Sequence, residues 1–222
     1  RAAGLDNLYI FTGTQATPDN IRKFHPNIIV SSTGSAPLLP PIAGLKDRID
    51  NENYNIYSIL GMISHINDFP KDLEGKKVVV VGGGAVGLDV VEFFADRNAD
   101  ISIVEMMDQI GRDLDPVSKN DTKTMMKKHN VHQLTKTALL EVKDSSFLVR
   151  GDGEPYELPF EYGFVCLGMR AQGQLYQNLT EEFSSEDVEI MNIGDSQRAR
   201  RIIDGTQEGR NILTILEQRG YL

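Results

Sequence analysis

Three glycines and one glutamate have types and spacing that suit the binding of a diphosphate. Gly82, Gly84 and Gly87 form a G-x-G-x-x-G run that directly follows four valines. In this pattern the first glycine permits a tight strand-to-helix turn, the second lets the backbone approach a pyrophosphate, and the third lets helix and strand pack closely. The pyrophosphate then lies at the amino end of the helix, where free amides and the helix dipole favour negative charge.

The residues around the glycines agree with this interpretation. Residues 77–81 form an apolar, β-branched run typical of a strand buried on both faces. Residues 88–98 have apolar side chains at helical spacing, and residues 100–105 form a second strand that ends in Glu105. That carboxylate lies about 18 residues after Gly87, where a group that binds the adenosine ribose is expected. The predicted dinucleotide contacts are Gly82, Gly83, Gly84, Ala85, Val86, Gly87 and Glu105. An ordinary β-α-β unit with a tight turn is the alternative.

The identity of the nucleotide depends on Glu105. A carboxylate accepts hydrogen bonds from both ribose hydroxyls and repels a 2′-phosphate, so the sequence favours NADH over NADPH. Residues 106–109 contain no cation, and Arg112 is the first basic side chain that follows. An Arg112 that folds back toward the ribose would leave NADPH as the alternative.

The composition limits the class of protein. With 222 residues the chain allows one large or two small domains, and 40% hydrophobic with 25% charged residues is ordinary for a soluble globular protein. A net charge of −9 argues against partners such as nucleic acid or anionic membrane surfaces, and no apolar run reaches transmembrane length. The single cysteine, Cys166, excludes an internal disulfide and a dithiol mechanism, and it suits a cytoplasmic location. Its apolar neighbours predict a buried small hydrophobe.

The pattern along the chain predicts an α/β fold. The expected helices are residues 16–24, 57–66, 88–98, 116–130 and 199–219, and the expected buried strands are residues 27–32, 77–81, 100–105 and 188–193. Residues 131–167 are interpreted as a β-meander whose last member is the apolar run 162–167. The proline-rich stretch 35–44 is expected to be a linker that does not pair inside a sheet.

Two similar strand endings suggest how these elements are divided between domains. Residues 28–34 read IIVSSTG and residues 164–170 read FVCLGMR, so both are interpreted as crossings from one domain to another. The sequence therefore predicts that residues 71–168 form a dinucleotide-binding domain inserted into a second domain. That second domain would consist of residues 1–70 and 169–222.

The order of the motifs resembles a known family. The segments Thr33-Gly34-Ser35-Ala36-Pro37, GGGAVG at 82–87, Leu167-Gly168 and Ile193-Gly194-Asp195 follow one another in the chain. This order is similar to that of the two-dinucleotide-binding-domain flavoproteins. It resembles most closely the C-terminal region of the old-yellow-enzyme-like iron–sulfur flavoproteins, which include 2,4-dienoyl-CoA reductase, 2-enoate reductase, the bile-acid-inducible NADH:flavin oxidoreductases and trimethylamine dehydrogenase. The resemblance covers nearly the whole chain.

The resemblance implies a Rossmann-like NAD(P)-binding domain inserted into a partial FAD-binding Rossmann-like domain. By this analogy the flavin site includes Thr33, Gly34, Gly168, Gly194 and Asp195, with Asp195 accepting a hydrogen bond from a flavin hydroxyl. A plain helix cap is the alternative role for Asp195, and in trimethylamine dehydrogenase the second site holds ADP instead of FAD. The implied reaction passes hydride from NADH to FAD and, in the intact enzyme, onward to an enoate or dienoyl-CoA substrate. No residue of this chain is nominated as a catalytic acid, base or nucleophile.

Parts of the family pattern are expected upstream of Arg1. These are the first G-x-G-x-x-G, which holds the ADP part of the flavin, an FMN-binding barrel, and the cysteines of an iron–sulfur cluster. The expected partners are therefore the upstream FMN barrel and the remaining FAD-domain segment of the same protein, with a homo-oligomer also compatible. Two alternatives stay open: a simpler flavoprotein such as an NADH oxidase or ferredoxin reductase, and a non-enzymatic NADH-binding regulatory module.

Two further groups of residues are expected to be structural. The pairs Met106-Met107 and Met125-Met126 are interpreted as core residues. His129 and His132 lie on either side of a helix end with no third ligand nearby in the sequence, so they are interpreted as solvated side chains and not as metal ligands.

Overall fold

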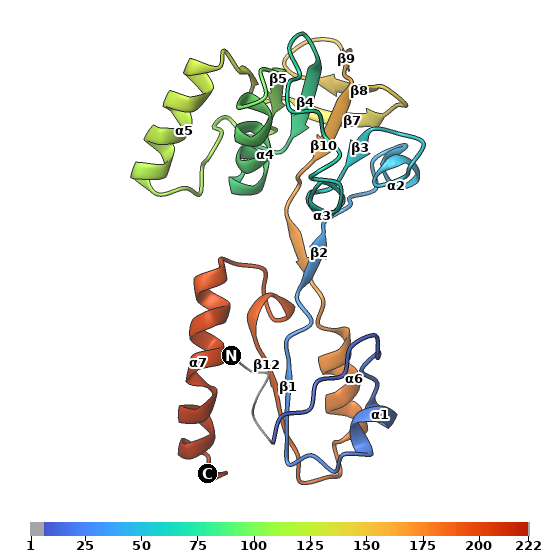
Figure 1. Ribbon diagram of the computed structural model, residues 1–222, viewed down its shortest axis with the longest axis vertical. Coiled ribbons are helices and arrows are strands. Elements are labelled where there is room, and N and C mark those ends of the chain that lie inside the picture. The colour runs from blue at the N-terminus through green and yellow to red at the C-terminus, as the bar shows by residue number, and fades with distance from the viewer. Residues whose placement is uncertain (1–6, 222) are drawn as a thin grey trace. The chain divides into compact units, whose positions relative to one another are not determined.

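The computed structural model describes residues 7–221, which form two compact α/β units (Figure 1). One unit is Pro37–Arg170, and the other combines Arg1–Ala36 with Ala171–Leu222. The boundaries fall within two short strands, β2 (Ser35–Pro37) and β11 (Met169–Ala171), which pair with each other. In the order of the chain, one unit is therefore inserted into the other.

The Pro37–Arg170 unit is built on a five-stranded sheet whose strands all pair in parallel. Its order is β3-β10-β4-β5-β6, with bounds Ile56–Tyr57, Tyr162–Val165, Lys77–Val81, Asp100–Val104 and His132–Leu134. Parallel sheets need cover on both faces, and in β4 only Lys77 at the start is exposed, whereas the four valines that follow are buried. Burial on both faces explains why the apolar residues of β4 are continuous in the sequence and do not alternate with polar ones.

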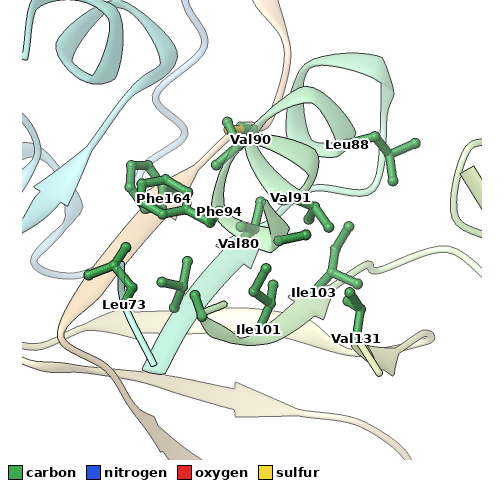
Figure 2. Packing of buried hydrophobic residues seen from close by; sticks show 14 of the residues in the cluster. Leu73, Val80, Leu88, Val90, Val91, Phe94, Ile101, Ile103, Val131 and Phe164 are labelled. Carbon is green, nitrogen blue, oxygen red and sulfur yellow. The ribbon is translucent and has the colours of Figure 1, made fainter. Parts of the chain in front are cut away.

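Successive valines of β4 point into two separate cores. Val78 and Val80 pack with helix α4 (Ala85–Ala95), whose Val90, Val91 and Phe94 are fully buried (Figure 2). On the other face, Val79 and Val81 pack against an antiparallel three-stranded sheet. Its strands are β7 (Ala138–Val142), β8 (Ser146–Arg150) and β9 (Tyr156–Pro159). The three-stranded sheet and α4 thus cover opposite faces of β4.

Helices begin where the sequence places capping residues. Thr17 caps α1 (Pro18–Arg22), Ser58 caps α3 (Ile59–Ser64) and Asp115 caps α5 (Pro116–Lys128), each by accepting a backbone amide hydrogen bond. Pro18 and Pro116 lie at the first helical positions, which need no amide donor. These three starts were predicted, whereas the short helix α2 (Leu45–Arg48) was not.

Three predictions about residues 35–70 and 162–167 differ from the structure. β10 is not a member of the meander but lies between β3 and β4 in the parallel sheet, because Phe164 and Val165 face the two cores in turn. The expected linker 35–44 contains β2. The boundary expected at residue 70 falls instead at Pro37, because β3 pairs with β10 and Leu45 is fully buried beside Val79.

The second unit contains a parallel pair of strands, β1 (Ile28–Ser31) and β12 (Glu189–Asn192). Ile29 of β1 packs against Leu179 and Phe183 from α6 (Gln174–Glu182) and its end, and Ile21 of α1 joins this cluster. A short 3-10 turn, η1 (Gly194–Ser196), follows β12, and α7 (Ile202–Gln218) ends the unit. Among residues 7–221, no helix is both long and apolar enough to cross a lipid bilayer.

Candidate dinucleotide site

A cavity of about 820 Å³ opens at the carboxyl ends of β4, β5 and β10 in the Pro37–Arg170 unit. In parallel α/β sheets this edge is where ligands bind. The glycine turn after β4, Glu105 after β5, and Gly168 after β10 all line it. The structure therefore brings together all the predicted dinucleotide contacts except Gly87, which lies beneath the turn and does not line the cavity.

The three fingerprint glycines differ in what surrounds them. Gly82 has φ +108°, and a side chain there would begin 2.2 Å from the carbonyl oxygen of Cys166. At Gly87 a Cβ would lie 1.9 Å from the carbonyl oxygen of Gly82. At Gly84, by contrast, a Cβ would meet no atom of residues 7–221 within 4 Å. Gly82 and Gly87 thus serve the fold, whereas Gly84 leaves free space at the cavity.

The amino end of α4 faces a ligand without a side-chain cap. Gly84 is its N-cap residue, and within the described part of the chain no side chain caps the first helical amides. Such amides and the helix dipole together favour an anion. Ala85 and Val86, the first two helical residues, line the cavity with Gly84. This arrangement is suited to a diphosphate.

Glu105 joins the glycine turn to the loop after β5. Its Oε2 accepts a hydrogen bond of 2.6 Å from the amide of Gly83, and its Oε1 accepts one of 2.7 Å from the amide of Met107. The two bonds hold the half-buried carboxylate at the cavity wall. Each oxygen keeps a second acceptor position, so hydroxyl groups can still donate to it.

Several wall residues were not predicted from the sequence. Met106, Met107, Gln109 and Arg112 follow Glu105 directly and line the cavity, so their nearness to the acid was an available signal. The assignment of Met106 and Met107 to the core is wrong, because their side chains are 68% and 40% exposed. Other residues that line the cavity had no local signal in the sequence: Pro40, Ile42, Thr137, Ala138 and Leu139.

Cys166 lines the cavity beneath the glycine turn and is 8% exposed. Burial, and to a lesser degree the carboxylate of Asp89, raises the pKa of its thiol to about 12. A thiol with this pKa is protonated at neutral pH and is a poor nucleophile. The prediction of a buried small hydrophobe is confirmed.

Of the remaining predicted site residues, Thr33, Gly34, Gly194 and Asp195 lie in the second unit. Gly168 lies in the Pro37–Arg170 unit, and its carbonyl accepts a hydrogen bond from the Leu38 amide at 2.9 Å. Asp195 Oδ2 accepts from the Ser35 hydroxyl at 3.1 Å, and its Oδ1 accepts from the Arg200 amide at 3.1 Å. Thr33 donates its hydroxyl to the Gln172 carbonyl at 2.6 Å. Gly34 has φ +76°, and its carbonyl accepts a hydrogen bond from the amide of Gln172. Thr33 and Gly34 are thus hydrogen-bonded to Gln172, and Asp195 is hydrogen-bonded to Ser35 and Arg200.

Asp195 is not the cap of the helix that follows it. The N-cap of α7 is Arg201, whose amide donates to the Asp204 carboxylate at 3.1 Å. Both Asp195 oxygens retain a free acceptor position, because each accepts one hydrogen bond. The helix-cap alternative from the sequence is therefore wrong.

Glu208 supports this turn and was missed by sequence reasoning. It accepts from the Gly194 amide at 2.6 Å and pairs with the guanidinium of Arg200. These hydrogen bonds, the one from Arg200 first, lower the pKa of the Glu208 carboxyl. The contact connects the middle of α7 with the turn after β12, and no local spacing rule would have indicated it.

Comparison with known proteins identifies relatives of the chain. The chain is similar to an NADH oxidase of Thermoanaerobacter brockii, with 26% identity over 199 residues that cover 89% of this chain and 29% of the oxidase. It is also 26% identical, over 234 residues, to a metal reductase of Desulforamulus reducens, covering 89% of this chain and 32% of that protein. The solved structure of a 2-naphthoyl-CoA reductase complex shares the fold, with a TM-score of 0.72, 22% identity, and coverage of 88% of this chain and 28% of that one.

The chain thus spans about a third or less of the length of these proteins. Residues 9–191 match the family model described as pyridine nucleotide-disulphide oxidoreductase. These matches confirm the resemblance to flavoproteins with two dinucleotide-binding domains. The chain belongs to the pyridine nucleotide-disulphide oxidoreductase family, whose members bind FAD and NAD(P)H.

Proposed function

We propose that the Pro37–Arg170 unit binds NADH and that the protein passes hydride from NADH to FAD. One observation carries this proposal: the uncapped amino end of α4 opens through Gly84 into a cavity whose wall holds the Glu105 carboxylate. An anion-binding helix end and a fixed acceptor at this spacing match a diphosphate joined to a ribose. A tight turn in an ordinary β-α-β unit requires neither the free space at Gly84 nor the carboxylate.

The proposed roles of the residues follow from their positions. The amides at the start of α4 would hold the pyrophosphate, Gly84 would let it approach, and Glu105 would accept from the ribose hydroxyls. The bound nicotinamide supplies the hydride and the flavin accepts it. The chain contributes binding and orientation, and no side chain needs to act as an acid, base or nucleophile.

The preference for NADH over NADPH rests on charge. The Glu105 carboxylate is held at the cavity wall by two amides, so it cannot swing away from a 2′-phosphate without breaking both hydrogen bonds. Arg112 lines the same cavity, and no ion pair among the described residues includes it. Arg112 therefore remains the side chain that could accommodate NADPH.

For the second unit we propose a flavin site at Thr33, Gly34, Gly194 and Asp195. The fit rests on Asp195, whose oxygens each keep an acceptor position for a hydroxyl, and on Gly194, where a Cβ would meet no atom of the described residues within 4 Å. With its single cysteine the chain has no dithiol for a disulfide-reductase mechanism, despite the name of its family. Whether FAD or ADP binds can be read from the absorbance of the released ligand.

The proposal for the whole protein extends beyond the chain. Because its relatives are about three times longer, we propose that an FMN barrel with an iron–sulfur cluster and the remaining FAD-domain segment act with it. The terminal acceptor would be an enoate or dienoyl-CoA compound. The gene sequence upstream of Arg1 tests this: a barrel with clustered cysteines supports it, and a direct continuation into a flavin-binding β-α-β unit favours a simple NADH oxidase, the activity named for one relative.

The test of the binding site is an NADH fluorescence titration of the wild type and of Gly84→Val. The valine side chain would occupy the space left for the pyrophosphate, so we expect affinity to fall at least about a hundredfold. Gly153→Val is the matched control, because Gly153 is also surrounded by open space but lies in a turn away from the cavity. Equal affinities of the two variants would refute the assigned site.

A second experiment separates an enzyme from a regulatory module. The longest product of the gene, loaded with FAD, is mixed with NADH without oxygen, and flavin absorbance is followed. Hydride transfer bleaches the flavin, whereas a module that only senses NADH binds it without bleaching. Bleaching in the wild type that is lost in Gly84→Val would connect the binding site to the reaction.

A further inference from the structure

Met106 and Met107 are the two methionines that the structure exposes at the nucleotide cavity. The sequence contains seven methionines. Met62, Met126 and Met191 are buried, and Met125 and Met169 are half-buried and do not line the cavity. Met106 and Met107 are 68% and 40% exposed, and both line it directly after Glu105.

The backbone holds this pair firmly at the wall. The Met107 amide donates to Glu105 Oε1 at 2.7 Å, and the Met107 carbonyl accepts from the Lys136 amide at 2.9 Å. The thioethers therefore form an apolar surface beside the carboxylate that would bind the ribose. Exposed apolar side chains at a fixed position beside a polar ligand group are typical of a ligand-binding wall.

We propose that Met106 and Met107 are a peroxide-sensitive modification site that controls NADH binding. The inference rests on the proposed NADH site. Hydrogen peroxide transfers one oxygen atom to the thioether sulfur, the O–O bond breaks, an S–O bond forms, and water leaves. The sulfur is oxidised by two electrons and the peroxide is reduced. The product, methionine sulfoxide, is polar and no longer provides an apolar wall.

The buried thiol and thioether groups of the unit do not compete with this pair. Cys166 is buried and protonated, so peroxide has little thiolate to attack. Met62 and Met126 are enclosed in the core of the parallel sheet and α4. Oxidation under mild conditions should therefore concentrate at Met106 and Met107.

The test treats the protein with hydrogen peroxide, removes the peroxide, maps sulfoxides by peptide mass spectrometry, and then titrates NADH. We expect sulfoxide at Met106 and Met107 first and a roughly tenfold weaker NADH affinity. Incubation with methionine sulfoxide reductases A and B should restore the affinity. These enzymes do not reduce overoxidised cysteine, so recovery would assign the loss to methionine sulfoxide.

Two double variants test whether the loss of NADH affinity comes from this pair. For each protein, the affinity after peroxide treatment is compared with that of its own untreated sample. Met106→Leu/Met107→Leu should show no loss on treatment, whereas Met125→Leu/Met169→Leu should lose affinity as the wild type does. Mapped sulfoxide at residues 106 and 107 with unchanged affinity would overturn the inference while leaving the NADH site intact. An untreated wild type that does not bind NADH would overturn both.

Discussion

At the scale of single residues, Glu105 has one task that the structure shows and a second that follows from the proposed function. Its oxygens accept from the amides of Gly83 and Met107, which orders the loops around the cavity. Its negative charge also lies where a ribose would bind under the proposed function. A neutral, isosteric side chain can keep part of the first task and lose the second, so the two can be distinguished by substitution.

Glu105→Gln should weaken NADH binding more than NADPH binding. We expect NADH affinity to fall about tenfold and the preference for NADH to shrink or reverse, because the charge that repels a 2′-phosphate is gone. Paired fluorescence titrations with both nucleotides measure this. Glu154→Gln, with the same charge change at an exposed turn, is the control. An unchanged ratio of the two affinities would contradict the role of Glu105.

The single thiol provides a test of burial and pH. Because the folded-state pKa of Cys166 is raised to about 12, above an ordinary value of about 8.5, the protonated thiol favours the folded state below about pH 8.5. This contribution is lost as the pH rises from there toward 12. At pH 8 the native thiol should react with a disulfide reagent on the order of a thousandfold more slowly than in urea. Equal rates in the two states would show that Cys166 is exposed.

At the scale of elements, the close contact between β4 and α4 depends on Gly87. A side chain at this helical position would lie 1.9 Å from the Gly82 carbonyl oxygen, so the helix would have to move away from the strand. The same movement would shift the amino end of α4, which faces the cavity. Stability and nucleotide binding are therefore coupled through one packing contact.

Gly87→Ala should lower the free energy of unfolding by at least about 2 kcal/mol. Gly153→Ala, where a Cβ meets nothing within 4 Å, should change it by less than about 1 kcal/mol. Urea unfolding of both variants followed by circular dichroism makes the comparison. A Gly87→Ala protein as stable as the control would mean that the helix lies farther from the strand than the structure shows.

At the scale of the whole molecule, the chain forms two units with separate cores. The Pro37–Arg170 unit contains both cores that enclose β4, and the other unit has its own cluster around Ile29, Leu179 and Phe183. Under the proposed function each unit has its own ligand. A ligand that binds only one unit should therefore stabilise that unit selectively.

Hydrogen exchange with mass spectrometry can test this selectivity. NADH at about a hundred times its dissociation constant should stabilise the unit that binds it by about 2.7 kcal/mol. Slower exchange is expected in β4, α4 and β5, and not in β1, β12 or α6. Protection spread equally over both units would contradict an NADH site confined to residues 37–170.

Much of the local structure was predictable because its causes lie within a few residues. Thr17, Ser58 and Asp115 cap helices by bonds to amides two or three positions later, so their effect can be read from the sequence. The chain position of β10 was also predictable, but its partners were not. An apolar strand of this length fits a meander or a parallel sheet equally well, and only burial against both cores decides between them.

The amino-acid sequence by itself determined the glycine turn, the acid after the second strand and the family, because these depend on backbone freedom and short spacings. Tertiary structure alone decided which residues close the cavity, that Met106 and Met107 are exposed, and that Glu208 bonds to Gly194. It also decided that residues 37–70 belong to the inserted unit and not to the flanking one. The physical reason is the same in each case: burial and long-range hydrogen bonds depend on elements that are distant in the chain and meet only after folding.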